Sequence, residues 1–382
     1  MSGGANAIDG CVLLSLEMMT AIENIDLVER TATVQPGVVN ARLKEAAAEV
    51  GLWYPPDPAS YEMCTIGGNI ATNAGGLCCV KYGVTRDWVQ SLEVVLADGR
   101  LITAGAGSRK DVVGYDVRGL LVGSEGTLGV VTRAVMRLRE PPGQASTLVA
   151  FLPDLAAAGA GVASICMSTT PALLEIMDQT SIVAVDDWTK MALDRDAVAM
   201  LLVQSDAETL QLRRQELNRI EEACGAAGAT YLATTHDPEE GELFLAARRL
   251  VYPSLERAGA TLLDDVAVPR ARLAELLERV PSIADVHDVR IAVFGHAGDG
   301  NLHPTLVFPH GDEAAVRRAR RAFAELLRLS LELGGSLTGE HGVGLLKVPF
   351  VEDQLGPDAL AVHRAIKSAL DPNGILNPGK LI

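Results

Sequence analysis

The sequence contains no apolar run that approaches the roughly 20 residues needed to span a bilayer. The short apolar stretch 11–16 has no basic region before it, so it does not fit a secretory signal peptide. Basic residues are also scarce: 33 lysines and arginines stand against 49 aspartates and glutamates, a formal net charge of −16. An acidic surface of this size repels phosphate backbones and anionic lipid headgroups. We therefore expect a cytoplasmic protein with no transmembrane segment and no nucleic-acid partner; the alternative is association with a membrane through partner subunits.

The six cysteines include no CxxC spacing, so the chain offers no obvious ligand set of its own for an iron–sulfur cluster. In a chain of 382 residues this pattern indicates buried, reduced thiols rather than a disulfide framework. Apolar residues make up 48% and charged residues 21% of the composition, which is typical of globular proteins. The length predicts two or three domains.

Short strands and helices alternate over about the first 140 residues. We expect buried strands at 12–16 and 31–34, a helix at 41–50, a hairpin with strands 92–96 and 101–103 around Asp98-Gly99, and a strand at 130–138. The cluster Pro141-Pro142-Gly143 is the best candidate for a domain boundary.

Beyond this cluster, strands alternate with alanine-rich helices, as expected for an α+β layered structure. The expected helices cover 155–167, 207–227, 238–254, 271–280 and 313–333, with strands at 173–177, 199–204 and 291–294. The last stretch, 371–379, is rich in turn-forming residues but contains apolar anchors, so we expect it to dock on the protein.

The first motif with chemical content follows Pro55-Pro56-Asp57-Pro58 and contains two diglycines, Gly67-Gly68 and Gly75-Gly76, within ten residues. Such a stretch places exposed amides and small polar groups along a loop and a helix start. That arrangement suits a flat anionic ligand such as a dinucleotide, because amides can face its pyrophosphate and glycine permits close approach. The alternative is a tight loop or a helix-packing site, since glycine clusters are common.

The second motif runs from His296 to His303 around Gly298-Asp299-Gly300. The glycines predict a hairpin that brings His296 and His303 opposite each other at its mouth. Two imidazoles on a rigid turn can bind a divalent metal. The alternative is a pair of structural histidines whose hydrogen bonds are satisfied within the core.

The third motif is Gly339-Glu340-His341-Gly342. Glu340 could complete a set of two histidines and one carboxylate with open coordination positions, which would leave His341 as a general base. The alternative is a solvated loop. Together the three motifs predict a flavin or nucleotide site and a metal-assisted acid–base site.

These motifs resemble those of the FAD-linked D-2-hydroxyacid dehydrogenases, and they occur in that family's order. The family includes the glycolate oxidase D subunit, D-lactate dehydrogenase (cytochrome) and D-2-hydroxyglutarate dehydrogenase. The resemblance runs from Ser2 to Lys380 and rests on these segments: Pro56-Asp57-Pro58, Gly67-Gly68-Asn69, Asn73-Ala74-Gly75-Gly76, Lys81-Tyr82-Gly83, Gly123-Ser124-Glu125-Gly126, the stretch 295–303, Gly339-Glu340-His341-Gly342 and Asn377-Pro378-Gly379-Lys380.

The resemblance implies an α+β fold with a vanillyl-alcohol-oxidase-type FAD-binding domain in residues 1–142. It also implies a ferredoxin-like α+β substrate or cap domain in residues 143–365, which carries the metal and catalytic site, and a C-terminal segment, 366–382, that returns to the FAD-binding domain. Relatives carry a glycine-rich FAD phosphate loop ahead of the Ser-Gly-Gly that stands here at Ser2. We therefore expect the FAD-binding domain to be truncated at its N-terminus.

The resemblance also implies the site residues. His341 would be the proton acceptor, and Arg248 would grip the substrate carboxylate. Arg249 is the alternative, because the family's usual aromatic residue upstream is missing. A divalent metal (zinc, manganese or iron) would be held by His296, His303 and Glu340. FAD would be bound by Pro56, Asp57, Thr65, Gly67, Gly68, Asn69, Thr72, Asn73, Gly75, Gly76, Gly126, Val130 and Asn377.

The implied activity is the oxidation of a small D-2-hydroxy acid, of the glycolate or D-lactate type, to the 2-oxo acid, with hydride transfer to flavin. Electrons would then pass to a quinone or to a separate iron–sulfur subunit. One alternative is a truncated, non-catalytic subunit of a glycolate oxidase-like complex. A second is a metal-dependent hydrolase, which the flavin-type motifs disfavour. These motifs do not specify which 2-hydroxy acid is the substrate.

Overall fold

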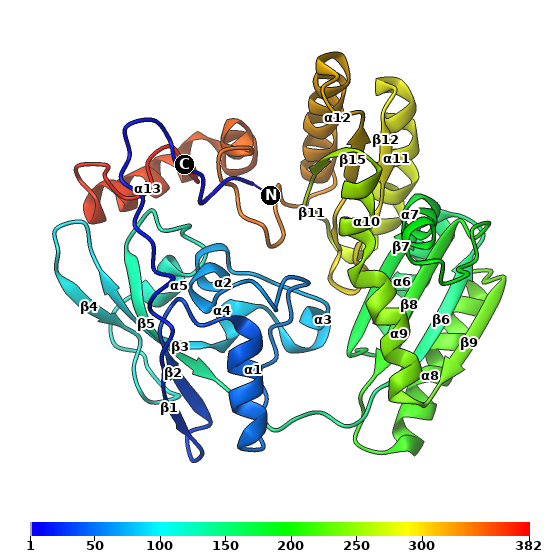
Figure 1. The fold of residues 1–382 in the computed structure, drawn as a ribbon, viewed down its shortest axis with the longest axis horizontal. Coiled ribbons are helices and arrows are strands. Elements are labelled where there is room, and N and C mark those ends of the chain that lie inside the picture. The colour runs from blue at the N-terminus through cyan, green and yellow to red at the C-terminus, as the bar shows by residue number, and fades with distance from the viewer. Residues whose placement is uncertain (1) are drawn as a thin grey trace. The chain divides into compact units, whose positions relative to one another are not determined.

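The computed structural model describes residues 2–382, which divide into two compact units (Figure 1). Unit 1 contains Leu77–Lys81 and Pro142–Gly339. Unit 2 contains Ser2–Gly76, Tyr82–Pro141 and Glu340–Ile382. Both units combine antiparallel sheet with helices, which confirms the expected α+β class.

Unit 2 is built on a five-stranded antiparallel sheet with the order β1-β2-β5-β3-β4. Strands β3 and β4 form the hairpin that Asp98-Gly99 predicted, with Val95 paired to Leu101. The strands are β1 (Ile22–Asp26), β2 (Thr31–Val34), β3 (Val89–Val95), β4 (Leu101–Ala104) and β5 (Val130–Arg137).

The helices of unit 2 are α1 (Asn40–Glu49), α2 (Ile66–Thr72), α4 (Thr85–Trp88), α5 (Val117–Leu121) and α13 (Val351–Leu370). The short helix α3 (Cys79–Tyr82) has Cys79–Lys81 in unit 1 and only Tyr82 in unit 2. Helix α1 buries Leu43 and Ala47 against the sheet, and Ile366 and Leu370 of α13 pack against the same core. The end of the chain is docked as expected, because Lys380 is buried and donates from its Nζ to the Asn6 carbonyl at 2.7 Å.

The expected buried strand at 12–16 is wrong. The segment has no strand pairing, and Val12, Leu13 and Leu14 are 94%, 72% and 66% exposed. A short apolar run forms a strand only where it pairs with a sheet edge, and this run pairs with neither edge strand of the five-stranded sheet, β1 or β4. The expectation of buried thiols also fails in part, because all six cysteines are free but Cys11 is exposed and only Cys224 is fully buried.

Unit 1 contains a seven-stranded sheet with the order β11-β14-β13-β7-β8-β6-β9 and a three-stranded sheet with the order β10-β15-β12. All neighbouring strands pair antiparallel. The strands are β6 (Ser146–Leu152), β7 (Leu173–Asp178), β8 (Ala199–Ser205), β9 (Tyr231–Thr235), β10 (Ala260–Leu263), β11 (Val266–Ala267), β12 (Arg290–Ala292), β13 (Phe294–His296), β14 (Asn301–Leu302) and β15 (Thr305–Phe308).

The helices of unit 1 are α6 (Leu155–Ser168), α7 (Gln179–Thr189), α8 (Leu210–Ala226), α9 (Pro238–Arg249), α10 (Val251–Ala258), α11 (Leu273–His287) and α12 (Glu313–Glu332). Several begin at an aspartate that caps the first turn; the Asp154 carboxylate, for example, accepts from the Ala157 N–H at 2.7 Å. Residues of α7, α9 and α10 share one apolar core with β7 and β8, and Leu77 belongs to the same core.

Two predicted elements of unit 1 are divided in the structure. The expected helix 238–254 breaks at Leu250 into α9 and α10. The expected strand 291–294 breaks at Val293, whose carbonyl accepts from the Asp178 N–H at 2.9 Å, so β12 and β13 join different sheets.

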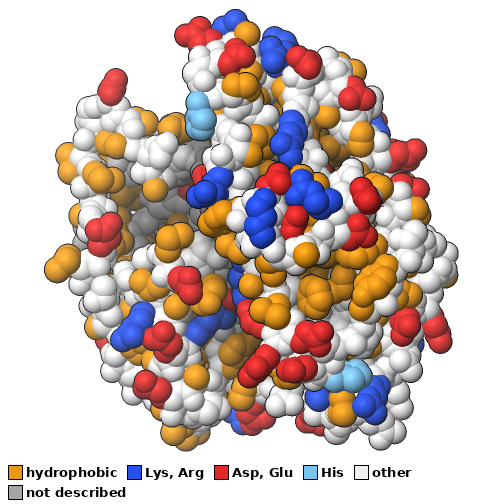
Figure 2. Space-filling model, turned by 45° about the vertical axis from the view of Figure 1, so that its right-hand side comes forward, with side chains coloured by type: hydrophobic (Ala, Val, Ile, Leu, Met, Phe, Trp, Pro, Cys, Tyr) orange, Lys and Arg blue, Asp and Glu red, His pale blue; other side chains and the backbone are white. Residues whose placement is uncertain are grey.

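Figure 2 shows acidic and basic side chains interspersed over one face of the molecule. Among the described residues, no helix has both the length and the apolar character needed to cross a membrane.

Candidate functional site

A tight hairpin in unit 1 brings two histidines together. Strand β13 ends at His296, the 3₁₀ turn η2 (Ala297–Asp299) follows, and β14 returns with Asn301 paired to His296. His303 lies two positions after Asn301, so the two histidines face each other diagonally. Their ring centroids are 5.1 Å apart, and both side chains are buried. This geometry confirms the predicted hairpin.

Glycine is required at two positions of this turn. Gly300 has a φ of +80°, and a Cβ there would lie 2.1 Å from the Val268 carbonyl oxygen. A Cβ on Gly298 would lie 2.9 Å from the Val80 side chain and 3.1 Å from that of Leu174. Larger residues would force the turn away from its neighbours, so these two glycines fix where the histidines stand.

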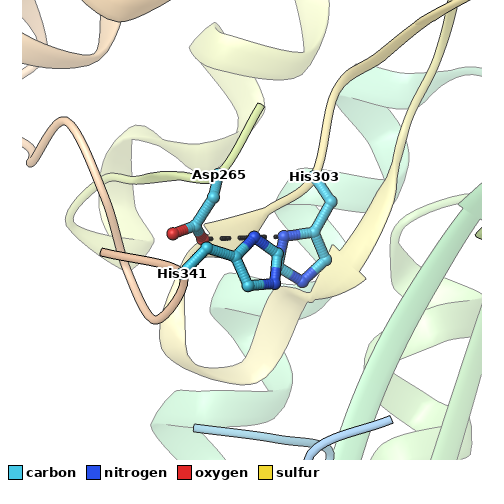
Figure 3. Close-up of side chains that lie close together, drawn as sticks. All are labelled: Asp265, His303 and His341. Carbon is cyan, nitrogen blue, oxygen red and sulfur yellow. Dashed lines mark ion pairs between the residues drawn. The ribbon is translucent and has the colours of Figure 1, made fainter. Parts of the chain in front are cut away.

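Each histidine has a buried carboxylate beside its Nδ1. Glu175 Oε1 lies 2.8 Å from His296 Nδ1, and Asp265 Oδ1 lies 3.6 Å from His303 Nδ1 (Figure 3). The two acids are 0% and 1% exposed. The hydrogen bond between Glu175 and His296 favours the tautomer with its hydrogen on Nδ1, and that leaves the Nε2 lone pair of His296 as the metal-binding donor. The donor set therefore fits a divalent cation.

Asp265 also organises the last residues of unit 1. Its carboxylate accepts from Asn301 Nδ2 at 2.8 Å, from the Thr338 hydroxyl at 2.5 Å and from the Gly339 N–H at 2.9 Å. A Cβ on Gly339 would lie 2.1 Å from Asn301 Nδ2, so the backbone comes very close here. The next residue is Glu340, and the peptide bond keeps its backbone beside Gly339.

Arg248 is a buried cation on α9. Its Nη2 lies 2.7 Å from Glu175 Oε2, and its guanidinium carbon lies 5.0 Å from the centre of the Phe294 ring. Among the described residues, neither Nε nor Nη2 has a hydrogen-bond acceptor in good geometry. Buried donors usually have an acceptor. Because Nε and Nη2 share one edge of the guanidinium plane, they suit bidentate binding of a carboxylate.

Arg249, the alternative to Arg248, pairs with a different glutamate. Its Nη1 lies 2.7 Å from Glu242 Oε1, and the Glu242 side chain is 59% exposed. The structure therefore connects Arg248 to the histidine hairpin through Glu175.

Glu340 and His341 belong to unit 2 and begin its last segment. His341 Nε2 lies 3.4 Å from Glu340 Oε1, and the His341 carbonyl accepts from the Ser2 hydroxyl at 2.8 Å. Two residues further on, the Val343 and Gly344 N–H groups donate to the Glu125 carboxylate at 2.7 and 2.9 Å.

Glu125 is a buried anchor for this segment. Burial raises the pKa of its carboxyl group, while the hydrogen bonds from the Val343 and Gly344 amides act in the opposite direction. Asn377 Nδ2 donates to the Glu125 carbonyl at 2.6 Å, so Glu125 connects the segment at 343–344 with the end of the chain.

Many of the residues expected to bind FAD gather around α2 in unit 2. The Asn40 side-chain amide donates to Asn69 Oδ1 at 3.0 Å and to the Pro56 carbonyl at 3.4 Å. A Cβ on Gly76 would lie 2.1 Å from the Asp57 carbonyl oxygen. The Gly123 and Glu125 N–H groups donate to carbonyls of α2, those of Ile70 and Ala71, which brings Gly126 to the same helix. Val130 instead begins β5 and pairs with Val95.

The first-turn amides of α2 are hydrogen-bonded within the protein, contrary to the expectation that they are available to a ligand. The Gly67 N–H donates to the Pro36 carbonyl at 2.8 Å, and the Gly68 N–H donates to the Thr65 hydroxyl at 3.1 Å. Gly67 is needed for close packing, because its Cβ would lie 2.6 Å from the Pro36 ring. These two amides are therefore occupied by the protein itself.

Other glycine amides nearby fit an anionic ligand better. Within residues 2–382, the N–H groups of Gly75, Gly76 and Gly126 have no hydrogen-bond acceptor, and Gly75 and Gly76 are buried. Buried N–H groups without an acceptor are rare in folded proteins. Gly126 has a φ of +71°, and the space where its Cβ would stand is open. This set fits the phosphate oxygens of a dinucleotide.

Sequence reasoning missed Glu175 and Asp265. Glu175 is the one acidic residue inside the apolar stretch Leu173–Met177, and a lone carboxylate in a buried strand is a usable signal. Asp265 directly precedes the two-residue strand β11 and gave no comparable signal, because only the folded chain brings it to His303.

Comparison with known families matches both parts of the chain. Residues 141–381 match the family described as FAD linked oxidases, C-terminal domain, and residues 1–105 match the family described as FAD binding domain.

Relatives of the chain match over its whole length. The glycolate oxidase subunit GlcD of Bacillus subtilis is 42% identical over 100% of this chain and 81% of its own length. A D-lactate dehydrogenase of Archaeoglobus fulgidus is 36% identical over 100% of this chain and 84% of its own length.

Two solved structures share the fold at low identity. A 4-ethylphenol oxidase from Gulosibacter chungangensis matches with a TM-score of 0.75 and 20% identity, over 99% of this chain and 83% of its own. A p-cresol methylhydroxylase matches with a TM-score of 0.76 and 17% identity, over 95% and 78%.

Proposed function

The chain belongs to the FAD-linked oxidase family, and we propose that it oxidises a small D-2-hydroxy acid to the 2-oxo acid with FAD as the hydride acceptor. The observation that carries this proposal is the buried Arg248, whose Nε has no hydrogen-bond acceptor among the described residues and whose Nη2 pairs with Glu175, the carboxylate that also meets the histidine His296. A substrate carboxylate would bind at the arginine while its neighbouring hydroxyl meets the metal site. Glycolate and D-lactate, named in the relatives, both have this pattern of groups.

In this proposal His296, His303 and Glu340 hold a divalent metal. Two imidazole nitrogens and one carboxylate leave coordination positions open for a substrate. The carboxylates behind the two histidines, and the anchoring of Gly339 one residue before Glu340, support this set. A divalent ion held there would lower the pKa of a substrate hydroxyl. Zinc, manganese and iron all suit these donors.

Arg248 and His341 supply the substrate-binding and proton-accepting groups of the proposed reaction. Arg248 binds and orients the substrate carboxylate through its Nε and Nη2 edge. His341 accepts the hydroxyl proton at Nε2, which lies 3.4 Å from Glu340 Oε1.

FAD, when bound, supplies the two-electron acceptor for the hydride. The amides of Gly75, Gly76 and Gly126 are the donors we assign to its phosphates, and the remaining expected FAD residues would line the same part of unit 2. Electrons would then leave to a quinone or to a separate iron–sulfur subunit; the Bacillus subtilis relative is itself named as a subunit of glycolate oxidase.

The test is a spectrum of the purified protein with added FAD, followed under anaerobic conditions by glycolate, D-lactate or D-2-hydroxyglutarate. We expect bound flavin and bleaching of its visible absorbance by at least one of these acids, with L-lactate as the matched control of opposite configuration. Bound flavin that none of the D-acids or glycolate bleaches would favour the non-catalytic subunit instead. Absence of flavin binding together with metal-dependent ester or amide hydrolysis would favour the hydrolase.

A further inference from the structure

We propose that Glu175 is a positioning residue shared by the metal site and the carboxylate-binding arginine. It fixes the tautomer of His296 through one oxygen and the orientation of Arg248 through the other. The inference rests on the metal ligands and the arginine role in the proposed function, and adds the residue that couples them.

The strand register explains why Glu175 reaches both partners. Strand β13 pairs with β7 so that Phe294 faces Met177 and Gly295 faces Ile176. The next step of this antiparallel register brings His296 opposite Glu175, and their side chains meet at 2.8 Å between Nδ1 and Oε1. Arg248 comes from α9, which contributes Leu245 and Ala247 to the core beside β7.

The burial of Glu175 makes a purely structural role costly. The side chain is fully buried in a strand whose other residues are mostly apolar, and burying an ion pair rarely stabilises a protein more than apolar packing does. Both carboxylate oxygens instead face groups that take part in the proposed chemistry, since Oε1 meets the Nδ1 of a metal-donor histidine and Oε2 meets a guanidinium. A carboxylate placed in this way holds the His296 hydrogen on Nδ1, so that Nε2 ligates the metal.

The substitution Glu175→Gln tests both proposed effects of Glu175, on the tautomer of His296 and on the orientation of Arg248. The glutamine amide can present its N–H₂ group to His296 Nδ1, which would favour the tautomer with the hydrogen on Nε2, and that nitrogen cannot then bind a metal. We expect metal affinity to fall by about 10- to 100-fold, the usual effect of losing such a partner. We also expect KM for the hydroxy acid to rise at saturating metal, because Arg248 loses the carboxylate that orients it.

The experiment titrates the metal-stripped full-length protein with Zn²⁺, in competition with a chromophoric chelator. Glu175→Gln should bind more weakly than wild type, Glu175→Asp should recover part of the loss, and His296→Ala should lose the site. Glu93→Gln is the matched control, since Glu93 is a strand glutamate paired with an arginine, Arg133, at 3.0 Å in unit 2. It should leave zinc affinity unchanged.

The outcomes are separable. Wild-type zinc affinity in Glu175→Gln, with loss in His296→Ala, would overturn the positioning role and leave the proposed metal site standing. Retained zinc binding in His296→Ala would overturn the metal site and the inference with it. If Glu175→Gln does not fold, nitrogen-15 chemical shifts of His296 in the metal-stripped wild type decide the question. A hydrogen on Nδ1 supports the inference, and a hydrogen on Nε2 contradicts it.

Discussion

The carboxylate of Asp265 accepts a hydrogen bond from the backbone N–H of Gly339 at 2.9 Å. Gly339 is the last residue of unit 1, and the two residues after it are the proposed ligand Glu340 and the proposed base His341. Asp265 therefore holds the start of the segment that carries both.

Replacing this acid tests that anchor. Asp265→Ala removes the acceptor shared by the buried Asn301 amide and by the partly buried hydrogen bonds from Thr338 and Gly339, and an unsatisfied buried donor costs about 1–3 kcal/mol. We expect a clear loss in the free energy of unfolding, measured by urea denaturation, and weaker zinc binding. Thr338→Val removes a single donor and should cost less. Equal stability of Asp265→Ala and wild type would contradict the anchoring role.

The two adjacent arginines provide a second test. Arg248→Ala should raise KM for the hydroxy acid by at least about tenfold, because a bidentate, charge-assisted contact contributes about 1.5–3 kcal/mol. Arg249→Ala removes a contact with the exposed Glu242 and should leave KM within about twofold. Steady-state kinetics on both variants decides between them, and a larger effect at Arg249 would reverse the assignment.

His341 carries the third prediction. His341→Ala should still bind FAD, because the change removes only an imidazole from the start of the 340–344 segment. It should lose substrate-driven bleaching of the flavin by about 10²- to 10⁴-fold, the usual contribution of a general base. Stopped-flow absorbance under anaerobic conditions measures the rate. Unchanged bleaching would exclude His341 as the base.

Elements bounded by turn-forming residues could be predicted from the sequence. Asp98-Gly99 specifies its own hairpin turn, and the glycines of 298–300 specify the turn that brings His296 to His303. In both cases the signal lies within a few residues of the structure that it determines.

The parts that could not be predicted depend on partners far away in the chain. Glu175 reaches His296 across 121 positions, through a strand pairing that no local pattern encodes. The Gly67 amide looked available for a ligand, but the Pro36 carbonyl occupies it after folding. The run at 12–16 is apolar enough for a strand, yet it pairs with no strand of the sheet and its side chains stay exposed.

Asp178 gives a prediction about pH. Its carboxylate caps α7 by accepting from the Ser181 N–H at 2.8 Å and the Ser181 hydroxyl at 2.6 Å. Burial raises its pKa from 3.8 to about 6, although these hydrogen bonds and the more distant charge of Arg290 act in the opposite direction. Between about pH 4 and pH 6 the folded state therefore binds more protons at Asp178 than the unfolded state does. This residue's contribution to stability consequently decreases as the pH rises through that window.

Asp178→Asn keeps a capping oxygen and removes the buried charge. We expect the free energy of unfolding at pH 8 to rise by roughly 1–3 kcal/mol relative to wild type, and the gain to disappear towards pH 4. Asp312→Asn is the matched control, because Asp312 caps α12 at the surface and the Ala315 N–H lowers its pKa. Its charge stabilises the folded state above the unfolded pKa, so this variant should lose stability at pH 8 and converge with wild type in acid. Urea denaturation across the range measures both, and a loss of stability in Asp178→Asn at pH 8 would contradict the prediction.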